Sequence, residues 1–394
     1  MTSFVPKGQL DLIAENSVKA EVVEEEIKEN VEKTVVDAND EVVKTPSNFD
    51  RSVEPAQGET PKLNIPESWT ATLKNGIKVL GIEQNELPTV SFSLVIEGGH
   101  LLDDKNKNGV ANLMTDILME GTANKTPEEL EEEIEMLGAS INMYTTNESI
   151  VVRGNTLVRN LDKTLALVEE ILLEPRWDEE EFARIKTSTI NQIKRSDANP
   201  NTVADRVYNK ILYGEDHIFS YPTSGTVASV EAITIDDLKD FYTKNFSPSI
   251  STFHIVGNIN KKESLSKLSN LEEKWKAKEV VIPTYPIANN RDKSSLYFVD
   301  IPNAKQSVIN IGYIALPRTD KDFYPVEVMN YKLGGSFSGN VNLILREEKG
   351  YTYGARTNFS GSKTPGTFTA SSSVRTNTTG ESVQIFKDQI TKYK

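Results

Sequence analysis

The chain has 394 residues, of which 37% are hydrophobic and 26% charged, and its formal net charge is −14. This length allows two domains of ordinary size, and the excess of acidic residues argues against a nucleic-acid partner, because phosphates need basic patches. The chain contains no cysteine, which excludes disulfides and thiolate zinc ligands and leaves cytoplasm and periplasm both open. It has no run of about 18 apolar residues, so no membrane span is predicted.

Residues 1–66 are predicted to form an acidic linker or arm. From residue 15 onward this segment is rich in Val, Glu and Lys and nearly free of aromatic residues, so it has little apolar surface with which to order itself. An amphipathic helix over residues 22–36 is the alternative, since Val23, Ile27 and Val31 are four residues apart. The apolar start of the chain suggests the tail of a preceding domain in a longer parent protein.

A first αβ unit is predicted over residues 67–271. It opens with a hairpin whose turn lies at Asn75 and Gly76. Its other strands alternate polar with apolar side chains and are predicted at residues 89–99, 140–148, 149–157 and 252–259. Helices with one apolar face are predicted at residues 109–120, from residue 127 onward, and at residues 161–172.

Three capping boxes mark further helix starts. They lie at residues 126–129, 178–181 and 234–237. Trp177 and Phe182 flank the box at residues 178–181 and are predicted to form a hydrophobic staple. A charged stretch at residues 272–292 contains proline and is predicted to be an interdomain linker.

A second αβ unit is predicted over residues 293–394 and repeats the first in outline. Its strands are predicted at residues 294–301 and 307–316 and again after residue 350, and its helices at residues 324–333, 341–348 and 382–394. The fold class is therefore α+β, with two structurally similar repeats. The second repeat is shorter by on the order of 100 residues, so we expect it to be incomplete, with a C-terminal truncation.

Two sequence stretches resemble the insulinase/pitrilysin, or inverzincin, family of zinc metallopeptidases. They are GVANLMTDILMEGT at residues 109–122 and LGGSFSGNVNLILREEKGYTYGA at residues 333–355. In that family the first stretch carries H-x-x-E-H on a helix, where the two His bind zinc and the Glu activates water. The resemblance implies two repeats, each with a mainly antiparallel sheet covered by helices.

The zinc ligands of that motif are missing from this chain. Asn112 and Asp116 stand at the two His positions, and Thr115 stands at the position of the Glu. Local alignment places Gln192 where the family has a downstream Glu ligand. A catalytic zinc needs about three converging donors, and Asn and Gln amides are poor ones.

The three histidines do not supply a substitute for those ligands. His100, His217 and His254 are far apart in sequence and lack ligand spacing, so we interpret each as a packing or surface residue. We therefore predict no metal or cofactor in this chain and expect zinc in a partner half.

Arg346 and Tyr353 match a pair that the family places after a glycine-rich loop in its C-terminal repeat. The resemblance implies that they face the zinc of the other half, where a Tyr hydroxyl and a guanidinium would stabilise an oxyanion. The structural alternative makes Arg346 a cation at a helix C-terminus and Tyr353 an ordinary strand aromatic.

The glycine-rich loop itself allows two interpretations. The resemblance implies that Gly334, Gly335 and Ser336 let substrate backbone approach closely, and the alternative is a permissive turn between helices. Family members also bind peptides along an exposed sheet edge, a mode that suits substrates of varied sequence.

Three functions remain open at this point. The first is a non-catalytic, substrate-binding half of a zinc metalloendopeptidase, in which Arg346 and Tyr353 complete a zinc-bearing partner's site for peptide hydrolysis. The alternative is a catalytically inert structural or peptide-binding scaffold of the same fold. The third is an independent hydrolase, although no Ser/His/Asp spacing or carboxylate pair stands out.

Overall fold

The computed structural model describes residues 62–286, 290 and 293–393, with a few positions between 50 and 60. The chain divides into two compact units, Met1–Asn64 and Ile65–Lys394, and the elements below all belong to the second. The alternative helix over residues 22–36 and most of the predicted arm lie outside the described residues.

The first sheet has six strands in the order β1-β2-β6-β3-β5-β4, and all neighbours are antiparallel except β2 and β6. The strands are β1 Ser68–Thr72, β2 Lys78–Glu83, β3 Thr89–Glu97, β4 Ser140–Thr145, β5 Ser149–Leu157 and β6 Ser251–Gly257. The predicted hairpin turn is confirmed, and Gly76 supplies its positive φ of 98°.

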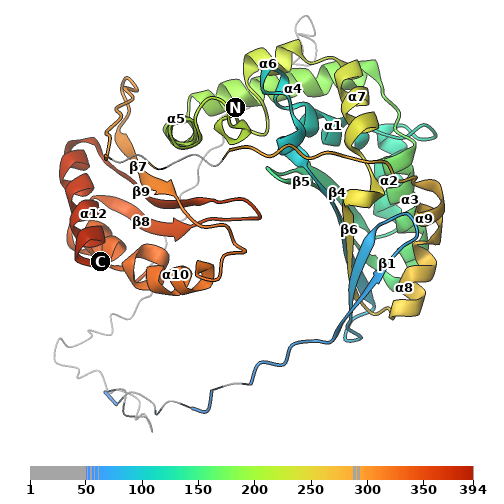
Figure 1. Ribbon diagram of the computed structural model, residues 1–394, viewed down its shortest axis with the longest axis horizontal. Helices are drawn as coiled ribbons and strands as arrows, with labels where there is room; N and C mark the ends of the chain where they lie inside the picture. Colours follow the sequence, from blue (N-terminus) through green and yellow to red (C-terminus); the bar gives the residue numbers. More distant parts are fainter. Residues whose placement is uncertain are drawn as a thin grey trace, which may run out of the picture. The chain divides into compact units, whose positions relative to one another are not determined.

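Helices pack on one face of this sheet (Figure 1). They are α1 Val110–Leu118, α2 Pro127–Met136, α3 Leu161–Leu173, α4 Glu179–Asp197, α6 Val227–Ala232, α7 Ile235–Asn245, α8 Lys261–Lys267 and α9 Ser269–Lys274. Helix α5 Pro200–Tyr213 follows α4 but contributes no side chain to the core beneath this sheet. Short 3-10 turns lie at η2 Gly99–Leu102, η3 Lys105–Lys107, η4 Val158–Asn160, η5 Ile218–Ser220 and η6 Pro248–Ile250. The alternation of β3 buries Val90, Phe92, Leu94 and Ile96 against these helices.

Two of the three predicted capping boxes are confirmed, at Thr126 and at Thr234. The third is only half formed. The Asp178 carboxylate accepts from the first turn of α4, but Glu181 accepts from Arg184 Nε at 2.6 Å and does not reach back to the cap.

The second sheet has three strands in the order β7-β9-β8, all antiparallel. They are β7 Gln306–Ile314, β8 Thr352–Phe359 and β9 Thr367–Arg375. Its helical elements are α10 Phe323–Asn330, the π-helix η7 Tyr331–Gly335, α11 Asn340–Asn342, the π-helix η8 Leu343–Glu348, the 3-10 turn η9 Thr376–Thr378 and α12 Thr379–Tyr393. They enclose a core of their own around Leu333, Val341, Phe368 and Phe386. The α+β class with two αβ repeats is confirmed, and the second repeat is the smaller.

The predicted strand at residues 294–301 is wrong. This segment has no regular secondary structure, and Leu296 and Phe298 are 87% and 85% exposed. In the first sheet β6 lies between β2 and β3 and pairs with both. Among the described residues of the second sheet, β7 pairs with β9 alone, so no strand pairs with residues 294–301. Alternating side chains can form a strand only where a neighbouring strand supplies hydrogen bonds.

Helix α5 contacts the second sheet. The Tyr208 hydroxyl donates to the Phe368 carbonyl at 3.2 Å and lies 2.9 Å from Thr369 Oγ1. Asn310 Nδ2 donates to Asp205 Oδ1 at 3.0 Å. A side chain at Gly312 would collide with the Tyr208 hydroxyl, so this glycine permits the close approach. No helix in the described part of the chain is long and apolar enough to cross a membrane.

Candidate functional site

A buried hydrogen-bond network positions α1, the helix that carries three of the predicted site residues. Gly109 precedes this helix with φ 105° and has no side chain with which to cap it. The Asp103 carboxylate takes that role, accepting from the backbone N–H groups of Gly109 and Ala111 at 2.9 Å each. His100 Nδ1 lies 2.8 Å from Asp103 Oδ2, so the helix start is fixed from within the core.

The structure brings Asn112 and Asp116 together on α1. Asn112 Nδ2 donates a hydrogen bond to Asp116 Oδ2 at 3.1 Å. Thr115 is fully buried, and its hydroxyl donates to the Asn112 carbonyl at 2.7 Å and lies 3.4 Å from Thr145 Oγ1 on β4. A buried hydroxyl that is bonded to its own helix is not available as a base for water.

Gln192 lies in the same cavity as Asp116. This cavity, called the α1–α4 cavity below, has a volume of about 380 Å³ and is lined by residues of α1, the turn that follows it, β4 and α4. Gln192 comes from the C-terminal half of α4, and Asn142 comes from the edge strand β4. Of the four predicted positions, Asp116 and Gln192 line this cavity, and Asn112 is hydrogen-bonded to Asp116.

The charges around the cavity are unevenly compensated. Arg184 Nη2 contacts Glu120 Oε1 at 2.6 Å, and Arg184 Nε donates to Glu181 Oε2 at 2.6 Å. No Lys or Arg in the described part of the chain forms an ion pair with Asp116. Burial, and then the nearby Glu120 carboxylate, raise the pKa of Asp116 to about 6.

The three histidines lie apart from this cavity and have other roles. His100 is fully buried, and its Nε2 lies within hydrogen-bond distance of the carbonyls of Ile218 and Tyr221. His217 caps η5, and burial lowers its pKa, while His254 lies on β6. Within the described residues, no group of three or more His, Asp or Glu could hold a metal ion.

Arg346 lies in the second π-helix of the second repeat. Its guanidinium is 4.5 Å from the centre of the Phe337 ring and donates to Glu347 Oε1 at 2.8 Å. The side chain of Arg346 is 35% exposed and that of Phe337 is largely exposed, so Arg346 is partly open to solvent.

Tyr353 lies on a β-bulge in β8. Between Thr352 and Ala355 the register with β9 shifts by one residue, and the Thr352 hydroxyl accepts from the Gly354 N–H at 3.0 Å. Tyr353 is 92% exposed on this edge strand. A bulge re-aims side chains, so a local backbone irregularity turns the phenol toward solvent.

The glycines of the loop have a packing role that their sequence does not reveal. A Cβ at Gly334 would lie 2.6 Å from Thr357 Oγ1 and 2.7 Å from Val341 Cγ2. Gly334 therefore lets η7 pack directly on β8. Ser336 donates from its hydroxyl to the Tyr331 carbonyl at 3.0 Å, and a substrate role for Gly334, Gly335 and Ser336 stays a prediction.

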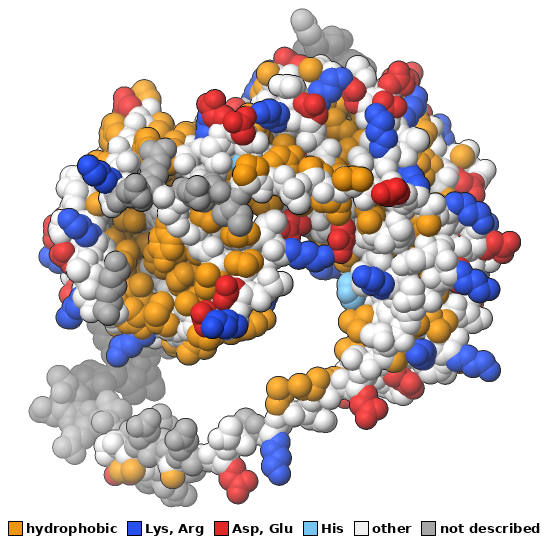
Figure 2. Space-filling view, in the orientation of Figure 1, with side chains coloured by type: hydrophobic (Ala, Val, Ile, Leu, Met, Phe, Trp, Pro, Cys, Tyr) orange, Lys and Arg blue, Asp and Glu red, His pale blue; other side chains and the backbone are white. Residues whose placement is uncertain are grey.

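Exposed apolar side chains gather over α10 and its neighbours. Figure 2 shows this concentration on the second repeat. The residues include Tyr324, Val328, Met329, Tyr331 and Phe337. α1 in the first repeat differs, because seven of its nine residues are buried.

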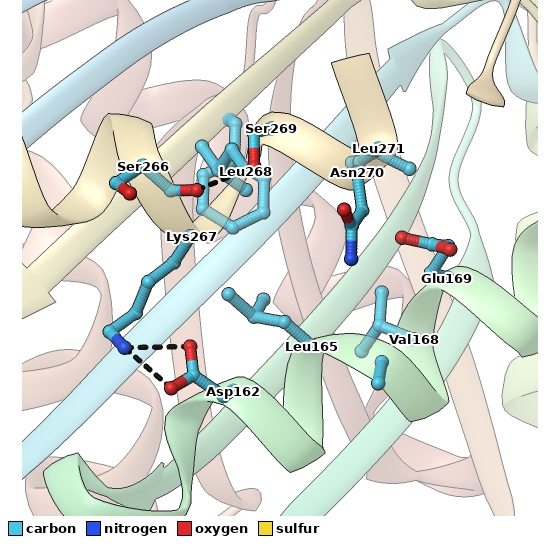
Figure 3. A pocket seen from close by; sticks show the side chains of 12 residues that line it. Asp162, Leu165, Val168, Glu169, Ser266, Lys267, Leu268, Ser269, Asn270 and Leu271 are labelled. Atoms are coloured by element: carbon cyan, nitrogen blue, oxygen red, sulfur yellow. Dashed lines mark hydrogen bonds and ion pairs between the residues drawn. The ribbon is translucent and has the colours of Figure 1, made fainter. Parts of the chain in front are cut away.

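A second cavity, of about 210 Å³, lies between α3 and the α8–α9 pair (Figure 3). Lys267 bridges both carboxylate oxygens of Asp162 at its rim at 2.6 Å. None of the predicted site residues lines this cavity.

Several solved structures share this fold. A crystal structure of a peptidase M16 inactive domain from Pseudomonas fluorescens matches with a TM-score of 0.79 and 24% identity, covering 83% of this chain and 79% of that one. A protease from Helicobacter pylori matches with a TM-score of 0.75 and 19% identity over 82% and 78% of the two chains. These similarities define the class of fold.

Family models identify the class more narrowly. Residues 78–220 match the model described as insulinase (peptidase family M16), and residues 232–394 match the peptidase M16 inactive domain. This chain belongs to peptidase family M16, the insulinase family, as its motifs predict.

Relatives within the family differ in what their names say about activity. An uncharacterized zinc protease YmxG from Bacillus subtilis is 22% identical over 72% of this chain and 68% of its own length. A non-peptidase homolog YmxG from Helicobacter pylori is 23% identical over 72% and 66%. The mitochondrial-processing peptidase subunit beta from Dictyostelium discoideum is 25% identical over 74% and 62%.

Proposed function

We propose that this chain is a non-catalytic, peptide-binding M16 subunit or half that completes the zinc site of a partner through Arg346 and Tyr353. The observation that carries the proposal is the position of Tyr353. Its phenol is 92% exposed, lies on a bulge of an edge strand, and has no hydrogen-bond partner in the described part of the chain. A bulge re-aims side chains, and here it presents an exposed, unpaired phenol that a partner molecule can reach.

The chemistry of the pair fits stabilisation of a developing negative charge. A phenol hydroxyl and a guanidinium both donate hydrogen bonds, and a tetrahedral intermediate of peptide hydrolysis carries an oxyanion. The zinc supplied by the partner would activate water there. Phe337 beneath the guanidinium limits the directions in which Arg346 can point.

The loss of ligands on α1 supports the division of labour. Asn112 is hydrogen-bonded to Asp116, and Thr115 is buried and bonded to its own helix. The peptide would bind along β4, the edge strand that borders the α1–α4 cavity through Asn142 and Met143.

The test mixes this chain with a zinc-bearing M16 subunit and follows cleavage of a quenched fluorescent peptide. Tyr353→Phe and Arg346→Ala should each lower kcat by about 100-fold, the usual cost of losing one oxyanion donor. Tyr324→Phe is the matched control, because Tyr324 is also an exposed tyrosine of the second repeat.

The alternative function, an inert scaffold, is favoured by the non-peptidase name of the Helicobacter relative. It predicts a stable complex in gel filtration whose peptide cleavage is unaffected by either variant. Equal cleavage by wild type, Tyr353→Phe and Arg346→Ala would reject the proposal in favour of the scaffold.

A further inference from the structure

The α1–α4 cavity contains polar side chains that have no hydrogen-bond partner. Among the described residues, no side-chain hydrogen bond involves Asn142, Ser188, Thr189 or Gln192, although all four line the cavity. Asn142, Ser188 and Gln192 are exposed, and Thr189 is 8% exposed as a residue, so these side chains can be reached from the cavity. Donors and acceptors that the fold leaves unpaired around a cavity are available to a polar ligand.

The charge of the cavity defines the sign of that ligand. Glu120 is compensated by Arg184, which also contacts Glu181. Asp116 has a neutral partner in Asn112 and no cationic one among the described residues. The cavity therefore has one carboxylate without a counter-ion, and a cation would restore neutrality.

The shape of the acceptors favours an ammonium group over a guanidinium. A guanidinium binds best to both oxygens of one carboxylate, and Asn112 already occupies Oδ2 of Asp116. An ammonium has three donors for separate acceptors, and the residues that line the cavity include Asp116 from α1, Asn142 from β4 and Gln192 from α4. Met119 and Ile185 add apolar surface on which an alkyl chain can lie.

We propose that the α1–α4 cavity binds a primary ammonium group of a peptide, with Asp116 as its counter-ion. The ammonium comes from a lysine side chain or from the peptide N-terminus. This inference rests on the proposed function in that the ligand is a peptide. It concerns the first repeat alone, so it can fail while Arg346 and Tyr353 still assist a partner.

The test is calorimetric titration of the full chain, without a partner, at pH 7.5. The probes are three short peptides that differ in their amines: one with lysine and an acetylated N-terminus, one with norleucine and an acetylated N-terminus, and one with norleucine and a free N-terminus. At least one amine-bearing peptide should bind ~10-fold or more tightly than the acetylated norleucine peptide, the scale of a hydrogen-bonded charge. The tighter of the two identifies the source of the ammonium.

Variants separate the cavity from non-specific attraction to an acidic protein. Asp116→Asn should reduce the advantage of the amine by ~10-fold, and Gln192→Leu should reduce it by a smaller factor. Asp162→Asn is the matched control, since Asp162 is a carboxylate of the same repeat that lines the second cavity. Equal binding of all three peptides, no measurable binding, or an equal effect of Asp162→Asn would overturn the inference. Circular dichroism and thermal unfolding of each variant establish that it is folded.

Discussion

Asn112 donates its side-chain amide hydrogen bond to Asp116 across one turn of α1 at 3.1 Å. By resemblance to the family, both residues occupy positions of histidines that bind zinc. The structure joins these two side chains by a hydrogen bond at the edge of a cavity that Gln192 also lines.

This arrangement predicts that zinc binding can be restored by few changes. The triple variant Asn112→His, Asp116→His and Gln192→Glu should hold about one equivalent of zinc, while the wild type holds less than about a tenth. Thr115 is left unchanged because it is fully buried and a Glu would not fit. Elemental analysis checks the outcome, and the double variant without Gln192→Glu is the control. A folded triple variant without zinc would show that Gln192 is not at the ligand position.

The raised pKa of Asp116 predicts a pH-dependent stability. The folded pKa of about 6 lies above the ordinary value of 3.8, so the folded protein holds this proton more tightly than the unfolded chain. The free energy of unfolding should therefore fall as pH rises from about 4 to 6. The decrease should reach up to about 3 kcal/mol, and the stability should stay at this lower value above pH 6. Glu120 and Arg184 are the charged residues that share the cavity with Asp116.

Asp116→Asn isolates this contribution. The variant should gain stability over the wild type as pH increases to 7, and the gain should vanish near pH 4. Urea unfolding at half-unit pH steps measures the difference between the two proteins. A difference that is constant across this range would mean that Asp116 titrates normally.

Gly334 provides a prediction about packing. Gly334→Ala should destabilise the protein by about 1–3 kcal/mol, because its Cβ would lie 2.6 Å from Thr357 Oγ1. Gly380→Ala is the control, since no atom lies near that position in α12, and it should be neutral or stabilising by up to about 1 kcal/mol. Thermal unfolding gives both values. Unchanged stability of Gly334→Ala with weaker peptide binding would favour the substrate role instead.

Asp103 provides a prediction about the support of α1. Asp103→Ala would leave His100 and two helix N–H groups without their acceptor inside the core, so we expect a loss of about 3–5 kcal/mol. Asp104→Ala, which removes an exposed cap on the short turn η3, should cost about 1 kcal/mol. Denaturant unfolding of the two variants compares them directly. Similar losses would show that the buried network does not hold the helix.

Local sequence signals predict much of this fold. The capping boxes at Thr126 and Thr234 are confirmed because all of their partners lie within four residues. A further box at Thr226 is not predicted, since its fourth residue is Ser229 in place of Glu or Gln. The half-formed cap at Asp178 shows the limit, because Arg184 in the same helix competes for Glu181.

Local sequence signals do not reveal contacts between residues that are far apart in the sequence. The strand predicted at residues 294–301 needs a neighbour in the sheet, and alternation alone does not reveal whether one exists. The contact of His100 with the Tyr221 carbonyl joins residues 121 positions apart, and no periodicity includes it. For the candidate site, resemblance indicates Asp116 and Gln192, but the unpartnered Thr189 and Asn142 emerge only from the folded chain.

The contacts of α5 limit where the chain can be divided into recombinant fragments. By sequence the helix belongs with the first repeat, yet Tyr208 is bonded to β9 and none of its side chains is fully buried. A recombinant fragment that stops at residue 271 would carry α5 without the strands that cover it. Such a fragment should be prone to self-association and to protease cleavage near residues 200–213, and useful expression boundaries should keep α5 and the second sheet on one polypeptide.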